Sequence, residues 1–265
     1  MVARPPDFAR TAADYARHRA GFPPRLLDEL AARDIVRAGS RVADLGTGTG
    51  SLARLFAQHG CAVTGVDIAE PLLEQAARLD REAGVRIDYV QAPAEATGLP
   101  SGELDVVSAG QCWHWFDRPA AAREVARLLT GEGSVVIAHF DWLTIPGGVV
   151  EATHEIVLRY TPPGEAAHGP WRFAGGTGIY PQWLSDLQGA GFRDIETFSF
   201  DLQARYSPES WVGRIRASAP VGGTLDEDGV RACARELQEM LKERFPADPL
   251  VVPHRTWAVT ARAPA

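Results

Sequence analysis

Short apolar runs alternate with amphipathic stretches through the middle of this 265-residue chain. A short apolar run between turn residues is typical of a buried strand, and an apolar position every three or four residues is typical of a helix. The pattern predicts strands at 41–46, 62–67, 86–91, 104–109 and 133–140, with helices at 50–58, 70–82 and 119–129. Such alternation is typical of the βαβ units of a parallel sheet, so we expect an α/β fold.

The pattern changes on both sides of this core, residues 41–140. Ahead of it, residues 1–40 predict an N-terminal arm of two short helices, at 8–19 and 26–36. Behind it, a helix near 149–160 is followed by a Gly/Pro-rich stretch too long for a simple turn. We therefore expect residues 141–180 to form a lid insertion.

The remainder of the chain, residues 181–265, predicts further sheet and helix. The expected elements are helices at 181–188, 208–217 and 227–244 and strands at 192–203 and 250–261. Residues 205–248 then form a helical insertion in the C-terminal part of the sheet. Because both insertions decorate one sheet, we expect one domain overall.

Composition narrows the class of protein. No apolar run approaches the roughly 20 residues of a membrane span, and the opening MVARPPDFAR lacks the apolar segment of a signal peptide, so we expect a cytoplasmic protein. The net charge of −7 argues against a nucleic-acid partner, which needs a basic face. The three cysteines never form a CxxC pair, so we expect buried thiols. His139, Asp141 and His154 share no ligand spacing, so we predict no metal site.

The stretch RVADLGTGTG places Gly46, Gly48 and Gly50 between a predicted strand and a predicted helix. Glycine lets backbone amides at a helix N-terminus approach a ligand without a Cβ in the way. The turn therefore predicts a ligand site. It does not identify the ligand, because Gly48, Gly50 and Ala53 also satisfy the GxGxxA variant of the dinucleotide fingerprint.

Two carboxylates favour one ligand over the other. Asp44 lies two residues before Gly46, where its charge would repel a pyrophosphate and attract an ammonium or sulfonium. Asp67 ends the next strand, from which an acidic side chain can bind both hydroxyls of a ribose, and Ile68 offers an apolar face to adenine. S-adenosylmethionine carries all of these groups. The alternative is that the two aspartates only cap the helices that follow them.

Four longer stretches carry a family resemblance. They are VADLGTGTG, VTGVDIAEPLLEQA, APAEATGLP and LDVVSAGQCWHWFD. Over residues 15–140, the sequence resembles class I S-adenosylmethionine-dependent methyltransferases, in the small-molecule, type 11-like branch with an HWF-like triplet after the fourth strand. The resemblance implies a Rossmann-like, doubly wound sheet of seven strands with an antiparallel last strand, and LVVPHRTWAVTARA fits that strand.

The resemblance also implies a set of cofactor contacts at the strand ends and in the arm. They are Tyr15, Arg19, Asp44, Gly46, Thr47, Gly48, Asp67, Ile68, Ala94, Glu95, Gly110 and Gln111. Asp44 and the glycine turn would line the methionine part, Ala94 and Glu95 the adenine edge, and Gly110 and Gln111 the amino-acid end. Tyr15 and Arg19 lie one helical turn apart, so both can close over the same site.

The segment GQCWHWFD places Trp113, His114 and Trp115 directly after the fourth strand. Ligands of open α/β sheets bind at this carboxyl edge, where two indole rings could exclude water and present flat faces to an acceptor. His114 could accept a proton from an acceptor hydroxyl or amine, because imidazole titrates near neutrality. The candidate catalytic residues are therefore His114, Trp115 and Tyr15. The alternative is that Trp115 packs the following helix and His114 bonds to the backbone.

The two insertions supply candidate contacts to the acceptor. Aromatic residues are dense there, and arginine or histidine could meet an anionic acceptor group. The candidate substrate-binding residues are Trp113, Trp142, Trp171, Arg216 and His254. Arg214, on the same predicted helix as Arg216, is a further cation of this kind.

We expect a methyltransferase, a monomer or homodimer, that transfers a methyl group to oxygen or nitrogen of a small aromatic or carboxylate-bearing acceptor. Carbon methylation, a nicotinamide-dependent oxidoreductase and a non-catalytic S-adenosylmethionine sensor stay open as alternatives. RNA methylation is disfavoured, because no basic surface interleaved with aromatic residues stands out and no NPPY-type tetrapeptide follows the fourth strand.

Overall fold

The structure, a computed structural model, describes residues 17–18, 20–161 and 176–265. The expected site residues Tyr15, Arg19 and Trp171 lie outside the described residues. Backbone contacts divide the chain into two compact units. The sheet unit comprises Gly21–Phe140, Ile179–Phe200 and Thr256–Ala265, and the helical unit comprises Met1–Ala20, Asp141–Gly178 and Asp201–Arg255.

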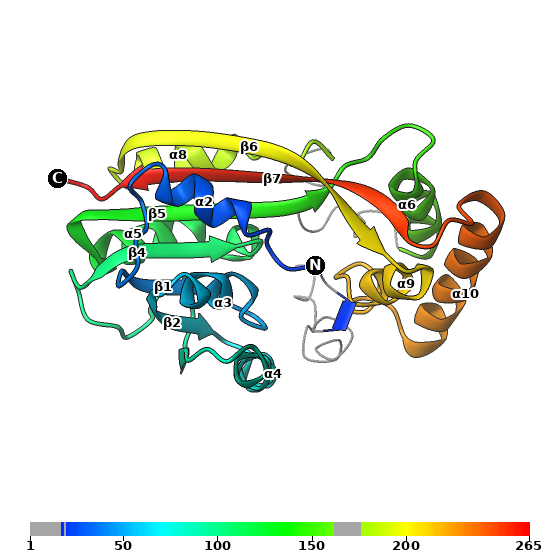
Figure 1. The fold of residues 1–265 in the computed structure, drawn as a ribbon, viewed down its shortest axis with the longest axis horizontal. Helices are drawn as coiled ribbons and strands as arrows, with labels where there is room; N and C mark the ends of the chain where they lie inside the picture. The colour runs from blue at the N-terminus through cyan, green and yellow to red at the C-terminus, as the bar shows by residue number, and fades with distance from the viewer. Residues whose placement is uncertain (1–16, 19, 162–175) are drawn as a thin grey trace. The chain divides into compact units, whose positions relative to one another are not determined.

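Seven strands form one sheet, in the order β3-β2-β1-β4-β5-β7-β6 (Figure 1). Their bounds are β1 Arg41–Leu45, β2 Ala62–Asp67, β3 Asp88–Gln91, β4 Leu104–Gly110, β5 Leu129–Trp142, β6 Arg193–Tyr206 and β7 Leu250–Arg262. The first five strands pair in parallel with one another. The order reverses at β1, so the carboxyl ends of β1 and β4 border a switch point, where open α/β sheets bind ligands.

The last strand runs against its neighbour. Gly133 of β5 accepts a hydrogen bond from the amide of Ala263, and Leu143, just after β5, donates one to the carbonyl of Pro253 in β7. Residue numbers therefore rise along β5 as they fall along β7, which is antiparallel pairing. The expected seven-stranded sheet with an antiparallel last strand is confirmed.

Helices cover both faces of the sheet unit. They are α2 Arg25–Ala31, α3 Ser51–Gln58, α4 Glu70–Ala83, the 3₁₀ turn η2 Trp113–Trp115, α5 Arg118–Leu128 and α8 Gln182–Gly189. Successive residues of a strand point to opposite faces. In β5, His139 stacks on Tyr180, which leads into α8, with ring centroids 3.8 Å apart, whereas the Phe140 ring lies 6.4 Å from Phe22, on the α2 side. Figure 1 likewise draws α2 in front of the sheet and α5 and α8 behind it.

The helical unit contains α6 Val149–Tyr160, α9 Pro208–Arg216 and α10 Glu227–Arg244, with α10 packed against the other two. Side chains cap two of these helices. Ser207 accepts a hydrogen bond from the amide of Ser210 at the start of α9, and Asp226 accepts one from the amide of Gly229 at the start of α10. Each cap satisfies an amide that has no partner within its helix.

Most predicted elements match the observed ones within one to three residues, and the helices at 149–160 and 227–244 match fully. Two differ more. The helix predicted at 26–36 ends at Ala31, because Asp34 adopts a left-handed φ of 53°, which a helix cannot contain. The strand predicted at 133–140 begins earlier, at Leu129, where a register shift lets Leu129 pair with Leu104.

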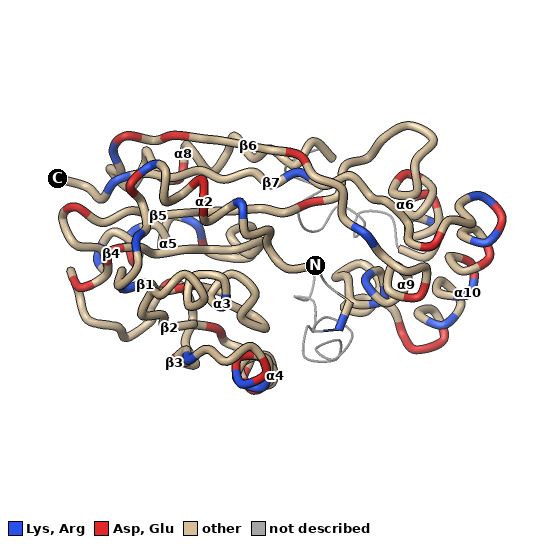
Figure 2. Tube along the Cα trace, viewed as in Figure 1, with Lys and Arg blue, Asp and Glu red and all other residues tan. Residues whose placement is uncertain are grey.

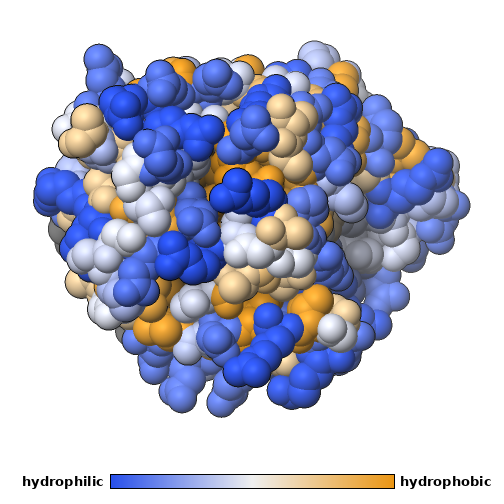
Figure 3. Space-filling view, turned by 60° about the vertical axis from the view of Figure 1, so that its left-hand side comes forward, coloured by the Kyte–Doolittle hydropathy of each residue, from blue (hydrophilic) through white to orange (hydrophobic). Residues whose placement is uncertain are grey.

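The surface mixes charges of both signs. Figure 2 shows Lys and Arg interspersed with Asp and Glu along α10, where Arg231 pairs with Glu227 and Asp228. On the face drawn in Figure 3, hydrophilic residues predominate and apolar ones form small separate patches. Among the described residues, no helix has both the length and the apolar character needed to cross a bilayer. The three cysteines are buried and free, as expected.

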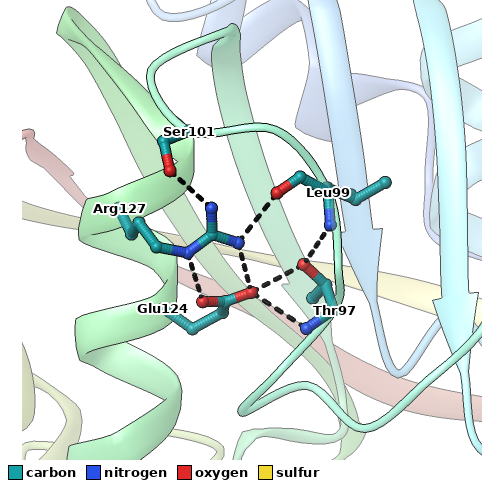
Figure 4. A network of polar contacts seen from close by, with 5 residues as sticks. All are labelled: Thr97, Leu99, Ser101, Glu124 and Arg127. Carbon is teal, nitrogen blue, oxygen red and sulfur yellow. Dashed lines mark hydrogen bonds and ion pairs between the residues drawn. The ribbon is translucent and has the colours of Figure 1, made fainter.

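A buried carboxylate ties the loop between β3 and β4 to α5 (Figure 4). Glu124 accepts hydrogen bonds from the amide and hydroxyl of Thr97, at 2.9 and 2.7 Å. Arg127 holds both oxygens of Glu124 at 2.7 Å and also bonds to Ser101 and the carbonyl of Leu99. The Arg127 guanidinium lowers the pKa of Glu124 to about 2. This network fixes the loop that carries Ala94 and Glu95.

We expect Glu124→Gln to lower the free energy of unfolding by about 1–3 kcal/mol at neutral pH, because Arg127 then lacks its buried counter-charge. A carboxylate with a depressed folded-state pKa stabilises the fold fully above its ordinary value of 4.5 and loses that effect as the pH falls towards 2. The difference in unfolding midpoint between the variant and the wild type should therefore narrow below pH 4.5.

Glu82→Gln is the matched control, because Glu82 pairs with Arg78 on the exposed face of α4. Its effect should stay within about 0.5 kcal/mol. Equal losses in the two variants, or a difference that does not narrow in acid, would contradict this account of the loop.

Candidate functional site

The turn after β1 has a backbone that suits glycine. Gly46, Gly48 and Gly50 adopt φ values of 60°, 55° and 75°, in the left-handed region that other residues rarely enter. The amide of Thr47 donates to the carbonyl of Val66 in β2, and that of Gly50 donates to the carbonyl of Thr47, which closes the turn onto α3. The sequence prediction of a glycine turn between strand and helix is confirmed.

Close neighbours add a second requirement for glycine. A Cβ on Gly46 would lie 2.9 Å from the sulfur of Cys112 and from the ring of Phe116. A Cβ on Gly50 would lie 2.7 Å from the hydroxyl of Tyr89. Around Gly48, by contrast, no atom of a described residue other than its chain neighbours lies within 4 Å of the position of a Cβ. The middle of the turn is therefore open, whereas its two ends are packed.

Asp44 lies buried at the end of β1, with 1% of its surface exposed. One carboxylate oxygen accepts a hydrogen bond from Thr47 at 2.7 Å, and the other accepts one from Ser108 of β4 at 2.6 Å. No cation among the described residues pairs with it. Burial raises the pKa of Asp44 to about 6, and the nearby charge of Asp67 acts in the same direction. The carboxylate therefore favours a positively charged ligand.

Asp67 ends β2 and holds the glycine turn from the other side. Its oxygens accept hydrogen bonds from the amide of Gly48 at 2.8 Å and from the amide of Ala69 at 2.9 Å. Burial also raises the pKa of Asp67. A carboxylate can accept about four hydrogen bonds, so Asp67 retains acceptor capacity for a ligand. Beside it, the side chain of Ile68 is largely exposed, with 69% of the residue accessible.

A buried ion pair that the sequence analysis missed braces this turn. Arg54 of α3 contacts Asp80 of α4 at 2.9 Å and also bonds to the carbonyl of Thr49 in the turn. Tyr89 of β3 donates to the second oxygen of Asp80 at 2.7 Å. Gly65 leaves room for that ring, since a Cβ there would lie 2.5 Å from it. Sequence spacing gave no signal, because each of these residues also fits a solvated helix face or an ordinary strand.

Gly110 and Gln111 lie at the end of β4, as predicted. A Cβ on Gly110 would lie 2.9 Å from the ring of Phe22 and 3.0 Å from Leu52. Gln111 adopts a left-handed φ of 57°, a conformation that side chains other than glycine rarely take. Its amide side chain donates to the carbonyl of Phe140. Such strain at the end of a strand is typical of a functional position.

Ala94 and Glu95 occupy the loop fixed by Glu124 and Arg127. Ala94 is buried. The carboxylate of Glu95 accepts a hydrogen bond from the amide of Asp117, which precedes α5, at 2.8 Å. Glu95 thus ties the same loop to the start of α5, and its expected contact with adenine stays a prediction.

The WHW triplet forms the turn η2, and its three rings differ in burial. Trp113 is fully buried, and its indole N–H donates to Asp186 of α8 at 3.0 Å. Trp115 is exposed. The ring of His114 is half-buried, 4.7 Å from that of Trp115 and 5.9 Å from that of His139. Only one of the two tryptophans therefore presents its ring outward, while Trp113 packs α5 against α8.

Three other candidates lie in the helical unit. Trp142 is half-buried, and its ring lies 5.3 Å from that of Trp211. His254 is buried, stacks on Tyr206 and shares a hydrogen bond of 3.1 Å with its hydroxyl. Arg216 lies on α9 two residues after Arg214, so the two side chains leave the helix on different sides. Of these candidates, the structure places Trp142 and His254 in one aromatic cluster of this unit.

We expect Gly50→Ala to destabilise the protein more than Gly48→Ala. Both substitutions place alanine at a left-handed φ, which costs about 1–2 kcal/mol. Only the Gly50 variant also forces a Cβ against Tyr89 and Arg54, which should add about 1–3 kcal/mol. Urea denaturation of both variants measures the difference. Equal losses would show that the ends of the turn are not closely packed.

Comparison with known proteins finds relatives of a part of the sheet unit. A family model described as a methyltransferase domain, Methyltransf_11, matches residues 43–137. The malonyl-[acyl-carrier protein] O-methyltransferase of Enterobacter lignolyticus is 35% identical over 127 residues, 48% of this chain and 49% of that protein. The chain spans about half the length of the first curated relatives it matches.

Two solved structures share the fold. A candidate type II methyltransferase of Anaeromyxobacter dehalogenans is 22% identical with a TM-score of 0.65, over 93% of this chain and 98% of that one. Phosphoethanolamine N-methyltransferase 2 of Haemonchus contortus, solved with phosphomonomethylethanolamine and S-adenosylhomocysteine, is 18% identical with a TM-score of 0.56, over 97% of this chain and 57% of that one.

The matched residues 43–137 contain Asp44, the glycine turn, Asp67 and the end of β4. Through these residues, this part of the chain is similar to the Methyltransf_11 family of methyltransferase domains.

Proposed function

We propose that this protein is an S-adenosylmethionine-dependent methyltransferase that acts on a small-molecule acceptor. One observation carries the proposal. Two carboxylates, the buried Asp44 and the half-buried Asp67, flank a glycine turn that is open at Gly48. The similarity of residues 43–137 to a methyltransferase domain supports the same activity.

The chemistry of Asp44 fits the charged end of this cofactor. Both oxygens of Asp44 are held by hydroxyl groups, which stabilise a carboxylate without neutralising it. A buried negative charge of this kind repels the pyrophosphate of a dinucleotide and attracts an ammonium or sulfonium. Asp44 and the turn from Gly46 to Gly48 would therefore hold the methionine part.

The chemistry of Asp67 and its neighbour fits the nucleoside end. Asp67 is fixed by two backbone amides and keeps acceptor capacity for ribose hydroxyls. Ile68 leaves an apolar surface open beside it, which suits one face of adenine. Ala94 and Glu95 would border the adenine edge, and Gly110 and Gln111 the amino-acid end.

The bound cofactor supplies an activated methyl group, so the protein's own task is to position the acceptor in a site without water. Such positioning can contribute about 7–11 kcal/mol. The exposed ring of Trp115 offers a flat apolar wall for the acceptor. His114, half-buried beside it, is suited to accept a proton from an acceptor hydroxyl or amine.

We infer oxygen or nitrogen as the methylated atom. The curated relative from Enterobacter lignolyticus is named as an O-methyltransferase, which favours oxygen. A proton leaves an oxygen or nitrogen nucleophile during such a transfer, and a half-buried histidine can take it. Carbon methylation is the alternative, and it needs a more acidic carbon centre in the acceptor.

The cofactor proposal predicts pH-dependent binding of S-adenosylhomocysteine, which keeps the ammonium group. Asp44 has a pKa of about 6 and must ionise to attract that cation. The affinity should therefore fall about tenfold between pH 7.5 and pH 5, by linkage of binding to the proton on Asp44. Isothermal titration calorimetry at the two pH values measures it.

Asp44→Asn should weaken binding at pH 7.5 and abolish most of the pH dependence. Asp88→Asn, which neutralises an exposed aspartate on β3, should change neither. A heat of binding measured with NAD, and none measured with S-adenosylhomocysteine, would favour the oxidoreductase alternative. If the wild type binds neither ligand, the proposed function is wrong.

The acceptor can be found by incubating the protein with methyl-labelled S-adenosylmethionine and cell extract, followed by mass analysis of the labelled product. With that acceptor, His114→Ala should lower kcat about a hundredfold or more, because it removes the proton acceptor, and should leave cofactor affinity nearly unchanged. His59→Ala, at the exposed end of α3, is the control. An unchanged kcat would remove the general-base role, and label found in RNA would overturn the acceptor class.

A further inference from the structure

Arg214, in the helical unit, has no counter-ion among the residues that the structure describes. Its guanidinium lies over the ring of Trp142, 4.7 Å from the ring centroid. No hydrogen bond or ion pair joins Arg214 to another of the described residues. Other arginines of the unit differ, since Arg255 holds Asp201 with two nitrogens and Arg159 pairs with Glu236.

The surroundings of Arg214 are aromatic. Trp142 contacts the edge of Trp211, and Trp211 in turn meets Tyr206 at a centroid distance of 5.2 Å. Tyr206 stacks on His254. We call these residues, with Arg214, the aromatic cluster of the helical unit. Trp142 ends β5, Tyr206 ends β6, and His254 lies in β7. Trp211 and Arg214 lie on α9.

The aromatic cluster carries little other charge. Burial, then the positive charge of Arg214, lowers the pKa of His254 to about 4, so this histidine is neutral at pH 7. Burial likewise lowers the pKa of His154, whose ring meets Trp142, to about 4. Asp141 is near enough for its charge to act on Arg214 but forms no ion pair with it. Arg214 is therefore the positively charged group of this cluster that is suited to bind an anion.

Burial of an unpaired cation is unfavourable, and the pKa of Arg214 reflects this. Burial lowers the pKa of Arg214, whereas the bond to Asp201 raises the pKa of Arg255. Stacking on Trp142 offsets a part of the unfavourable energy, by about 0.5–2 kcal/mol. A guanidinium that stacks through its face still presents N–H donors at its edge, in a fork that matches a carboxylate. The residue as a whole is half-buried.

We propose that Arg214, stacked on Trp142, binds the carboxylate of a small organic molecule within the helical unit. One guanidinium with Asp141 nearby suits a monoanion such as a carboxylate better than a phosphate dianion, which generally needs more than one cation. The aromatic rings suit a ligand whose carboxylate is attached to an apolar or aromatic body. This inference concerns the helical unit alone and does not rest on the proposed function.

The test uses the full chain and needs no knowledge of the natural ligand of this site. The probes are formate, acetate and benzoate, compared with chloride at equal ionic strength and with benzamide, the uncharged counterpart of benzoate. We expect the carboxylates to raise the thermal unfolding midpoint and benzamide to leave it unchanged. Titration by the midpoint shift gives an apparent dissociation constant for each probe.

Three variants make the comparison specific. Arg214→Met keeps an apolar stem over Trp142 and removes the charge, so carboxylate binding should weaken at least tenfold. Arg214→Lys keeps the charge without the planar fork, so binding should weaken less. It also carries the comparison if the methionine variant fails to fold. Arg205→Met removes an exposed arginine of β6 and should bind carboxylates as the wild type does.

Removal of Arg214 should also leave the ligand-free protein as stable as the wild type or raise its unfolding midpoint, since it removes an unpaired buried charge. A wild type that no carboxylate stabilises, or stabilisation that persists in Arg214→Met, would overturn the proposal. Stronger stabilisation by phenyl phosphate than by benzoate would overturn the choice of a carboxylate. S-adenosylhomocysteine binding, measured on the same samples, distinguishes these results from failure of the proposed function.

Discussion

The candidate cofactor site depends on a turn that has room for little more than backbone. At one end of it, Cys112 and Phe116 occupy the space beside Gly46, and at the other end Tyr89 and Arg54 occupy the space beside Gly50. The chain can pass only with glycine at these points and with left-handed dihedral angles. Because the ends are packed, the open middle at Gly48 is held in one place. The packing of the sheet unit is thus what gives the turn its shape.

Asp44 and Arg214 are charges of opposite sign, and each lacks an ion-pair partner among the described residues. Asp44 is a buried anion that accepts hydrogen bonds from two hydroxyl groups, and Arg214 is a cation that stacks on a ring. Each lowers the stability of the protein without ligand, because desolvation of a charge is unfavourable. Elsewhere, the buried carboxylates of Asp80 and Glu124 have arginine partners. This contrast separates residues that hold the fold together from residues suited to bind.

The fold was predictable because its signals are local. Apolar periodicity and glycine or proline punctuation gave the strands and helices, and the spacing of Asp44, the glycines and Asp67 gave one edge of the site. The braces of that edge were not predictable. Arg54, Asp80 and Tyr89 come from three elements and meet only through tertiary packing, and burial separated Trp113 from Trp115 although both follow the same strand. The pattern of apolar residues predicts whether a segment is a strand or a helix. The partner of a charged or aromatic side chain, by contrast, depends on the whole fold.

The amides of Gly48 and Ala69 donate hydrogen bonds to Asp67, and these bonds lie entirely within the protein. The loop conformation is therefore reached during folding, and its entropy is lost then and not at the moment of encounter. A small molecule that arrives meets amides already arranged. Its capture should accordingly proceed in a single kinetic step whose observed rate rises linearly with concentration, without the plateau that a slow rearrangement of the loop would impose.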